Sequence, residues 1–192
     1  MQGLSDIALI AQVVALGSER AFGQLVEAHQ EAVRRFLRRL TAGDEMRADD
    51  LSQETFIRAW QGLSSFRQLS GFETWLLRIA YRVFLDDERA LNHSPLAHDG
   101  ADLSTLDSGA AAASSPTRES STAGLSMDLD QALSTLSETE RTCVVLQCVE
   151  GQSIKEIAQI MGIPENTVKS HLLRGKKNLA NYLRRNGYGG GD

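Results

Sequence analysis

The sequence predicts an all-α protein with two small helical domains joined by a flexible linker, the second of them a helix-turn-helix domain. Apolar residues recur at i, i+3, i+4 and i+7 through most of the 192-residue chain. No segment shows the period-two alternation that indicates a strand. Residues 92–126 are rich in Ala, Ser, Gly and Asp and lack aromatic side chains, so they cannot form a core. We therefore expect helical domains over 1–91 and 127–185, a linker over 92–126, and a disordered tail over 186–192.

The composition, with 42% hydrophobic and 23% charged residues, is typical of a soluble globular protein. No apolar run approaches the roughly 18–20 residues that cross a bilayer. The apolar segment IALIAQVVAL, which starts at Ile7, follows Asp6 and is preceded by no Lys or Arg, which argues against a signal peptide. We expect a cytoplasmic protein that does not insert into membranes.

The N-terminal domain is expected to contain four helices. The first covers about residues 5–16 and ends at Gly17, and the second begins after Ser18 and runs to the break at Gly43. The third and fourth cover about residues 48–63 and 72–91. The core-facing positions of the second helix are Phe22, Leu25, Val26, His29, Val33, Phe36, Leu37 and Leu40.

The third helix, in the stretch DDLSQETFIRAWQGL, is predicted to have a buried stripe and a separate acidic face. The buried stripe comprises Phe56, Ala59, Trp60 and Leu63. The other face comprises Asp50, Glu54, Ile57 and Gln61, with Leu51 beside them. Exposed apolar side chains among carboxylates suit a protein-docking surface, because the apolar contacts supply energy and the charges set the orientation. The alternative is an ordinary surface with a scattered exposed Leu and Ile.

The stretch FRQLSGFETWLLRIAYRVF interleaves aromatic rings with guanidinium groups. The rings belong to Phe66, Phe72, Trp75 and Tyr81, and the guanidiniums to Arg67, Arg78 and Arg82. This combination suits unstacked bases, because every base has a π face and every nucleotide has a phosphate. The alternative is that the rings belong to the core.

The second domain contains a predicted helix-turn-helix, SIKEIAQIMGIPENTVKSHLL. Ser137 with Glu140 and Ser153 with Glu156 each predict a capping box. Gly162 stands in the turn, where a positive φ is often required. The side chains that can pack the two helices together are Ile154, Ile157, Ala158, Met161, Ile163, Val168 and Leu172. The alternative is a helical hairpin without a DNA-binding role.

The second helix of this pair is strongly basic in a chain whose formal net charge is -5. From Pro164 to Arg185 it has six Lys or Arg residues and the single carboxylate of Glu165. In a helix-turn-helix such a helix enters the major groove with its N-terminal end first. The residues expected to meet bases or phosphates are Glu165, Asn166, Thr167, Lys169, Ser170, His171, Arg174, Lys176 and Lys177.

The sequence contains no pattern that indicates catalysis or metal binding. Cys143 and Cys148 lie five positions apart on one predicted helix and match no zinc spacing, so we expect two buried thiols, with a redox sensor as the alternative. Of the four histidines, two fall in or beside the predicted linker and one on a core stripe. No nucleophile–base arrangement and no Gly-rich phosphate loop is present. We therefore expect no enzyme activity, no cofactor and no metal.

Three stretches, in chain order, resemble a bacterial sigma factor of the extracytoplasmic-function (ECF) group. DDLSQETFIRAW resembles the polymerase-binding signature of that family, and FETWLLRIAYRVFLDDER resembles its promoter-melting helix. The segment from LSTLSETERT to LLRGKKNL resembles its helix-turn-helix domain. The resemblance implies a protein that binds core RNA polymerase, directs it to specific promoters and supports strand opening. It also implies control by an anti-sigma factor.

The resemblance implies a role for each surface. The residues that would dock on the clamp helices of the largest polymerase subunit are Asp50, Leu51, Gln53, Glu54, Ile57 and Gln61. Those near the single-stranded −10 element, around a loop that captures a flipped base, are Phe66, Arg67, Phe72, Trp75, Arg78 and Arg82. The basic helix would read the duplex −35 element, and the linker would run through polymerase toward the RNA exit path.

The chain departs from the family pattern at three places. Arg82 stands where the family usually has Asn, and DDERA stands where it has a basic run. His171 replaces the usual Arg of the recognition helix, so that TVKSH is closer to response-regulator activators. A DNA-binding regulator that does not dock on polymerase is therefore the alternative function. That alternative leaves the face with Asp50, Glu54 and Ile57 unexplained.

Overall fold

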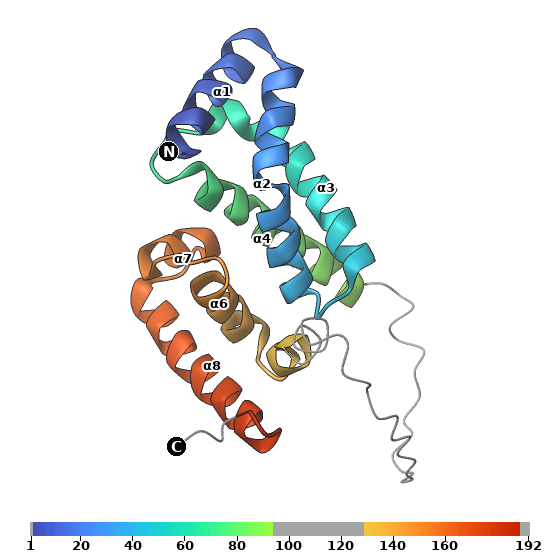
Figure 1. Cartoon of the computed structure of the whole chain (residues 1–192), viewed down its shortest axis with the longest axis vertical. Helices are drawn as coiled ribbons and strands as arrows, with labels where there is room; N and C mark the ends of the chain where they lie inside the picture. Colours follow the sequence, from blue (N-terminus) through green and yellow to red (C-terminus); the bar gives the residue numbers. More distant parts are fainter. Residues whose placement is uncertain (1, 94–128, 189–192) are drawn as a thin grey trace.

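The computed structural model describes residues 2–93 and 129–188, and these residues form helices and turns without a strand (Figure 1). This confirms the all-α fold and its two helical domains. Residues 94–126 of the predicted linker and residues 189–192 of the predicted tail lie outside the described residues. Within the described ranges, no helix has both the length and the apolar character of a membrane span.

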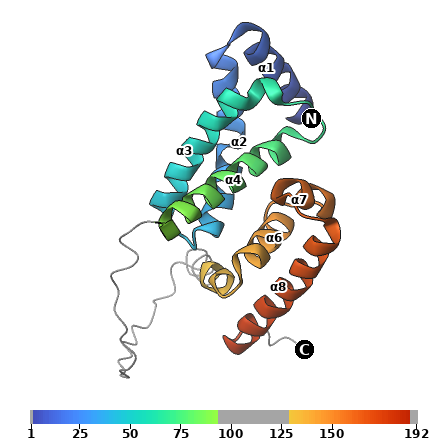
Figure 2. The ribbon, with the colours of Figure 1, turned by 180° about the vertical axis from the view of Figure 1, so that it is seen from behind.

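The N-terminal domain consists of α1 (Gln2–Leu16), α2 (Glu19–Leu40), α3 (Glu45–Gly62), the 3-10 turn η1 (Leu63–Ser65) and α4 (Phe72–His93). The helices α2, α3 and α4 pack against one another, and α1 lies beside the N-terminal part of α2 (Figures 1 and 2). Their shared core is tightly closed. Its fully buried residues include Leu25, Phe36, Leu37, Leu77, Ala80 and Phe84.

Local signals set the helix ends of this domain. Gly17 ends α1 with a φ of 62°, and the Ser18 hydroxyl accepts a hydrogen bond from the Ala21 amide at the start of α2. The third helix begins at Glu45, three residues before the expected start. The reason is that the Asp44 carboxylate accepts a hydrogen bond from the Arg47 amide and caps the helix there.

The C-terminal domain consists of a short helical segment over residues 129–134, then α6 (Glu138–Cys148), α7 (Ile154–Met161) and α8 (Glu165–Arg185). The capping box at Ser153 is confirmed, because the Ser153 hydroxyl and the Glu156 carboxylate each bond the other residue's amide. The expected box at Ser137 is only half formed. Ser137 caps α6, but the Glu140 side chain lies near Asn178 and Arg174 of α8 instead of bonding back to Ser137.

Two glycines allow the helices of this domain to approach each other. Gly162 adopts a left-handed φ of 69° in the turn between α7 and α8, as expected. Gly175 is a close-approach site that the sequence did not indicate. A Cβ atom there would lie 2.9 Å from the Cγ2 atom of Val144 on α6. The basic helix therefore packs closely on α6 at this point.

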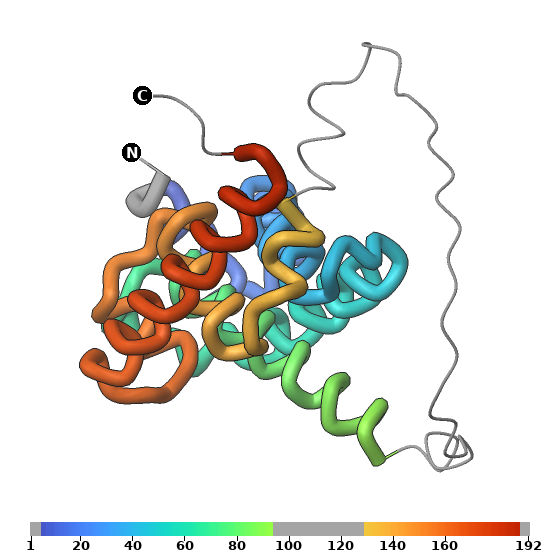
Figure 3. The backbone as a smooth tube through the Cα atoms, turned by 90° about the horizontal axis from the view of Figure 1, so that it is seen from below, coloured from blue at the N-terminus to red at the C-terminus, as the bar shows by residue number. Residues whose placement is uncertain are grey.

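The two domains contact each other directly. The helix α7 packs on α4, and α6 packs on α2 (Figure 2). The basic helix α8 lies on the side of the C-terminal domain that faces away from the N-terminal helices (Figure 1). Seen from below, the last turns of α4 extend beyond the packed helices (Figure 3). Of the predicted disordered tail, residues 186–188 instead close the end of α8, because their amides bond to carbonyls of its last turn.

Candidate protein- and DNA-binding surfaces

The structure exposes most of the predicted polymerase-docking residues on one face of α3. We call this set the acidic face; it comprises Asp50, Gln53, Glu54, Ile57 and Gln61. Ile57 is 53% exposed, which is high for an isoleucine. The side chain of Asp50 is exposed as well. An apolar side chain thus stands in water among carboxylates and amides, as a docking surface requires.

The expected exposure of Leu51 is wrong, because this side chain is only 6% exposed and belongs to the core. The buried stripe of α3 consists of Ala48, Leu51, Thr55 and Ala59. Thr55 is fully buried because its hydroxyl donates to the Leu51 carbonyl at 2.7 Å, which satisfies its polar group. Because Thr55 is polar, the sequence pattern did not show that this side of α3 is the buried one. Leu51 therefore supports the acidic face from beneath.

A second apolar surface adjoins the acidic face. Trp60, which we expected to be buried, is 39% exposed and makes an edge-to-face contact with Phe22 of α2 at 4.9 Å between ring centroids. The two rings, with Phe56 and Ile57, line an open hollow of about 380 Å³ whose rim includes Glu19. We call this site the apolar hollow. Ile57 belongs to both surfaces, so they are continuous. The sequence did not indicate the hollow because Phe22 fits the core pattern of α2.

Two arginines of α3 hold the acidic DDERA run of α4. The Arg58 guanidinium donates to Glu54 and to Asp86, each at 2.7 Å. These hydrogen bonds, with that from Asp86 the larger, raise the pKa of Arg58 above its usual value. Arg47 likewise donates to Asp87 at 2.7 Å and also pairs with Glu88. The carboxylates at this departure from the family pattern therefore tie α4 to α3, and one of them orients Glu54 through Arg58.

The aromatic and basic stretch around η1 and α4 forms a surface pocket. Three rings meet there: Phe66 lies 5.7 Å from Phe72 and 5.4 Å from Trp75, and Phe72 stacks on Trp75 at 5.6 Å. The pocket has a volume of about 280 Å³. We call it the aromatic pocket; it is lined by Ser65, Phe66, Arg67, Leu69, Ser70, Trp75, Arg78, Ile79 and Arg82. It offers a ring face beside three guanidiniums, which suits an unstacked nucleotide.

Phe72 is not available to DNA, contrary to its predicted place in this site. Its side chain is 6% exposed and packs edge-to-face on the buried His29 of α2. It therefore supports the pocket wall. Leu69, which the sequence did not single out, is 85% exposed at the rim of the pocket. Beside it, Gln68 has a φ of 55°, an uncommon conformation for a non-glycine residue that often marks functional loops.

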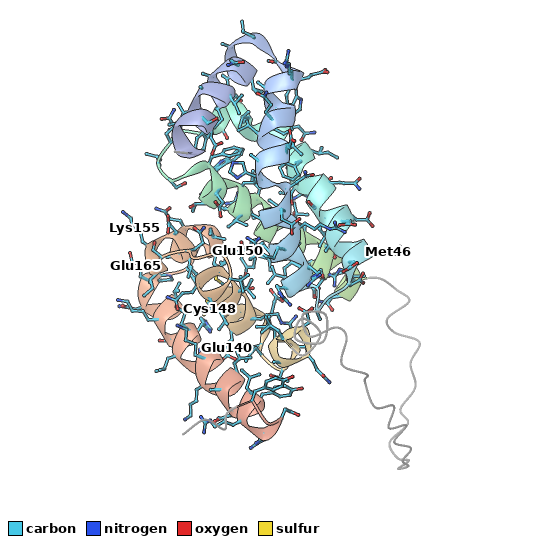
Figure 4. The ribbon with its side chains drawn as sticks, viewed as in Figure 1. Met46, Glu140, Cys148, Glu150, Lys155 and Glu165 are labelled. Carbon is cyan, nitrogen blue, oxygen red and sulfur yellow. The ribbon has the colours of Figure 1, made fainter. Side chains whose placement is uncertain are left out.

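The predicted DNA-reading residues lie along the N-terminal half of α8. Thr167 and His171 are half-buried, and the exposed members of the set are Glu165, Asn166, Lys169, Ser170, Arg174, Lys176 and Lys177. Lys155, on α7, and Glu165 lie at neighbouring corners of the helix-turn-helix (Figure 4). Arg174 is held in place, since its guanidinium lies 3.1 Å from His171 Nδ1 and 3.5 Å from Glu140 Oε1.

Leu173 is a surface residue that the sequence did not single out. It is 74% exposed and stands one helical turn from Lys169, beside Lys176 and Lys177. A leucine that no core contact explains, within a basic face, offers an apolar contact to a partner. The signal was available in the sequence, because the buried residues Val168 and Leu172 fix the core side of α8 and place Leu173 outside it.

The cysteines and histidines that the structure describes gather at no common site. Cys143 is buried, and its sulfur lies 3.4 Å from that of Met161. Burial raises the pKa of the Cys143 thiol to about 11. Cys148 is exposed, so the expectation of two buried thiols is wrong (Figure 4). His29 lies 3.1 Å from the buried Asp6 carboxylate. Among the described residues, no group of three or more His, Cys, Asp or Glu side chains is placed to hold a metal ion.

Two family descriptions match the chain, in order. Residues 25–93 match Sigma-70 region 2, and residues 126–179 match Sigma-70 region 4. The first match covers α3, η1, α4 and most of α2. The second covers α6, α7 and the DNA-reading part of α8. The two matched regions therefore contain the acidic face, the aromatic pocket and the DNA-reading part of the basic helix.

Curated relatives and solved structures agree with these matches. The ECF RNA polymerase sigma-E factor of Haemophilus influenzae is 31% identical over 191 residues, which cover 94% of this chain and 96% of that one. The probable RNA polymerase sigma factor RfaY of Xanthomonas campestris is 30% identical over 173 residues, 88% of this chain, and this chain spans 42% of its length. The structure is similar to that of the sigma factor RpoE in complex with the anti-sigma factor NepR from Bartonella quintana, with a TM-score of 0.67 and 26% identity over 85% of this chain and 96% of that one. With both regions present in order and a relative matched over nearly its whole length, the chain belongs to the ECF group of the sigma-70 family of RNA polymerase sigma factors.

Proposed function

We propose that this sigma factor divides its work among three surfaces, which bind core RNA polymerase, the −10 element and the −35 element. As a sigma factor it directs polymerase to promoters and supports strand opening. The observation that carries the proposal is the presence of all three surfaces on one chain, within the two matched family regions. Sigma factors are initiation factors and not enzymes, so RNA synthesis itself belongs to the polymerase. A regulator that only binds DNA would have no use for the acidic face.

The acidic face docks on the clamp helices of the largest polymerase subunit. Its carboxylates, Asp50 and Glu54, set the orientation of docking against cationic side chains of the partner. The sequence predicts that Leu51 supplies apolar contacts to the partner, but Leu51 is buried. The adjoining apolar hollow supplies those contacts in its place. An apolar side chain of the partner entering between Phe22 and Trp60 would be removed from water, and central, well-packed anchors of this kind carry most of the energy of an interface.

The aromatic pocket captures a base that leaves the duplex at the −10 element. Trp75 and Phe66 offer ring faces for stacking, and base–aromatic stacking contributes about 1–3 kcal/mol per base. Arg67, Arg78 and Arg82 then meet the flanking phosphates. The pocket stabilises the open strand, because a base held there cannot pair with its complement.

The N-terminal half of α8 enters the major groove of the −35 element. Asn166, Lys169 and Ser170 face base edges, while Lys176 and Lys177 meet backbone phosphates. Leu173 contacts a thymine methyl group, which is the apolar feature that the major groove presents. Arg174, an exposed side chain that lies near His171 and Glu140, meets a backbone phosphate.

The remaining assignments follow from this division. Residues 1–91 and 127–185 form the polymerase- and −10-binding domain and the −35-binding domain, and residues 92–126 connect them through the polymerase. The protein acts in the cytoplasm, where polymerase and promoters are found. It is held inactive by an anti-sigma factor, a proposal supported by its likeness to a sigma factor solved in such a complex.

The decisive experiment combines core binding with run-off transcription. The purified chain should co-purify with core polymerase and should yield promoter-dependent transcripts from genomic fragments of its own source. A chain that binds duplex DNA but neither binds core polymerase nor supports transcripts would contradict the sigma assignment and favour the DNA-binding regulator. A chain that binds core polymerase but gives no transcript from any fragment would contradict the promoter-directing part alone.

A further inference from the structure

Four charged side chains form one continuous series of hydrogen bonds that begins in the acidic face. The Nε atom of Arg58 donates to Oε1 of Glu54, and its Nη1 atom donates to Oδ2 of Asp86, each at 2.7 Å. The other oxygen of Asp86, Oδ1, accepts from Nη1 of Arg89 at 2.9 Å. We call the set Glu54, Arg58, Asp86 and Arg89 the charge line. Each hydrogen bond uses different atoms, so all three are made at the same time.

The charge line crosses from one helix to another. Glu54 and Arg58 belong to α3, Asp86 belongs to α4, and these two helices pack against each other (Figure 2). A guanidinium is a rigid planar fork, so acceptors on two different helices fix both its position and the direction of its plane. Arg58 is therefore held in place from α4 while it holds Glu54 on α3.

The Glu54 carboxylate is held without being used up. Its hydrogen bond from Arg58 involves Oε1 and not Oε2, and the side chain is 43% exposed. An ionised carboxylate offers about four lone-pair sites, so it can accept from Arg58 and from a cation of a partner together. Arg58 thus orients this docking carboxylate and leaves it open to a partner.

The fold does not depend on the charge line. Its side chains are exposed by between 39% for Arg58 and 67% for Arg89, and ion pairs as exposed as these contribute little to stability. The helices α3 and α4 also share a closed apolar core and a second ion pair, in which Arg47 donates to Asp87 at 2.7 Å. A role in stability therefore does not account for the series of contacts that leads to Glu54.

An oriented carboxylate lowers the free-energy cost of docking. Without Asp86, Glu54 and Arg58 would form an isolated pair four residues apart on an exposed helix face, which is weak. Both long side chains would then rotate in the free chain, and a partner would have to order them on binding. Ordering such side chains reduces the affinity of an interface. With Asp86 in place, much of this ordering is already present before the partner arrives.

We propose that Asp86 is a positioning residue for core-polymerase binding, which acts through Arg58 to hold the Glu54 carboxylate in its docking direction. The order of the Arg58 side chain is a property of the free chain. Its consequence for docking rests on the proposed function of the acidic face. Asp86 affects docking in this way from α4, through its contact with α3.

NMR relaxation of the Arg58 Nε–H group tests the order of this side chain without polymerase. In the wild type the group should move with the folded chain, and in Asp86→Ala it should show fast internal motion. Asp87→Ala is the matched control, because it removes the same charge from the next residue, which pairs with Arg47 instead. Arg58→Lys identifies the signal. Equal mobility of the group in the wild type and in Asp86→Ala would overturn the proposal.

Equilibrium binding to core polymerase tests the consequence. Asp86→Ala should bind about fivefold more weakly than the wild type, a factor within the range that ordering one long side chain costs. Asp87→Ala should bind as the wild type does. Asp87 is the more buried of the two, at 32% against 47% exposed, so a loss of stability alone would harm Asp87→Ala at least as much. Asp86→Glu keeps a carboxylate and should restore most of the affinity, and circular dichroism establishes that each variant is folded.

A double-mutant cycle tests the route through Glu54. Glu54→Gln should weaken core binding at least as much as Asp86→Ala does, and adding Asp86→Ala to Glu54→Gln should cause no further loss. A fivefold loss in both backgrounds, or equal affinities of Asp86→Ala and Asp87→Ala, would overturn the positioning role of Asp86 alone. If Glu54→Gln binds core polymerase as tightly as the wild type does, the assignment of the acidic face to polymerase is wrong, and the docking role of Asp86 falls with it.

Discussion

Two of the helices that carry proposed binding surfaces, α3 and α8, have opposite charge and opposite construction. The acidic face of α3 continues into the apolar hollow, whereas α8 surrounds one exposed leucine with cations. Asp44 caps α3 through its side chain, whereas Pro164 supplies no side-chain cap to α8, which leaves amides of the first turn for a phosphate. The difference follows from the partner: a protein surface offers apolar side chains to bury, and DNA offers phosphates to neutralise.

This contrast also explains the charge of the whole chain. With six basic residues on α8 and a net charge of -5 overall, the remainder of the chain is acidic. A chain of this kind binds non-specific DNA weakly, because the phosphates repel most of its surface. The basic helix becomes effective when a partner holds it over a promoter, which raises its effective concentration there.

The largest effect is expected from reversing charge on the acidic face. Asp50→Lys should weaken core-polymerase binding about 100-fold, because juxtaposing like charges at an interface costs several kcal/mol and 1.4 kcal/mol corresponds to a factor of ten. Equilibrium binding of labelled protein to core polymerase measures the effect. Glu27→Lys, an exposed carboxylate on α2, is the matched control and should bind as wild type does. Equal core affinities for the two variants would remove the acidic face from the interface.

The apolar hollow should contribute the next largest effect. Trp60→Ala removes a half-exposed ring that is expected to become fully buried on docking. It should cost about 2 kcal/mol, or about 30-fold in core affinity. Met46→Ala removes an 82% exposed apolar side chain from the same helix, outside the hollow, and should have no effect. If Trp60→Ala changes thermal stability but leaves core affinity intact, the hollow belongs to the fold and not to the interface.

A smaller effect is expected where a ring meets a base. Trp75→Leu keeps an apolar side chain in the aromatic pocket but loses the stacking face, which should lower promoter opening about tenfold, within the 1–3 kcal/mol that stacking of one base contributes. Fluorescence of 2-aminopurine in the −10 element reports the opening. Phe72→Leu, in the buried neighbour, should lower the melting temperature and leave opening intact below it. Equal loss of opening in both variants would mean that the pocket acts through stability alone.

The sequence predicted what local interactions determine. Helix caps, glycine turns and helical periods depend on only a few neighbouring residues, so the helices and their order could be predicted. Examples are the caps at Ser18 and Ser153 and the left-handed turn at Gly162. Most of the acidic face followed from spacing along one helix. The surfaces that lie on a single helix were therefore within reach of sequence reasoning.

Features that depend on two helices could not be predicted in this way. Leu51 was predicted to be exposed because a polar Thr55 did not look like a core residue, but its hydroxyl is satisfied inside the core. Trp60 was predicted to be buried because its contact with Phe22 of α2 exists only in the packed structure. Phe72 is buried because α2 presents His29 to it. Glu150 accepts a hydrogen bond from Arg35, which lies 115 residues away in the sequence, and no local pattern predicts that contact. In each case the deciding neighbour is remote in sequence and close in space.

The smallest effect is expected from a single phosphate contact on α8. Lys176→Ala should weaken binding of the full chain to −35 duplexes by a similar factor, about threefold, whatever their sequence. It should also reduce the slope of log affinity against log salt concentration by about 0.9, because one fewer counterion is released. Arg20→Ala, an exposed cation at the start of α2, is the control and should leave the slope unchanged. A loss confined to duplexes with one particular base would instead make Lys176 a reader of sequence.

The contrast with α3 becomes sharper if the two variants affect different measurements. Asp50→Lys should change the affinity for core polymerase and leave the salt slope of DNA binding as it is. Lys176→Ala should change the salt slope and leave the affinity for core polymerase as it is. Each helix would then bind its partner through the chemistry that its exposed residues present.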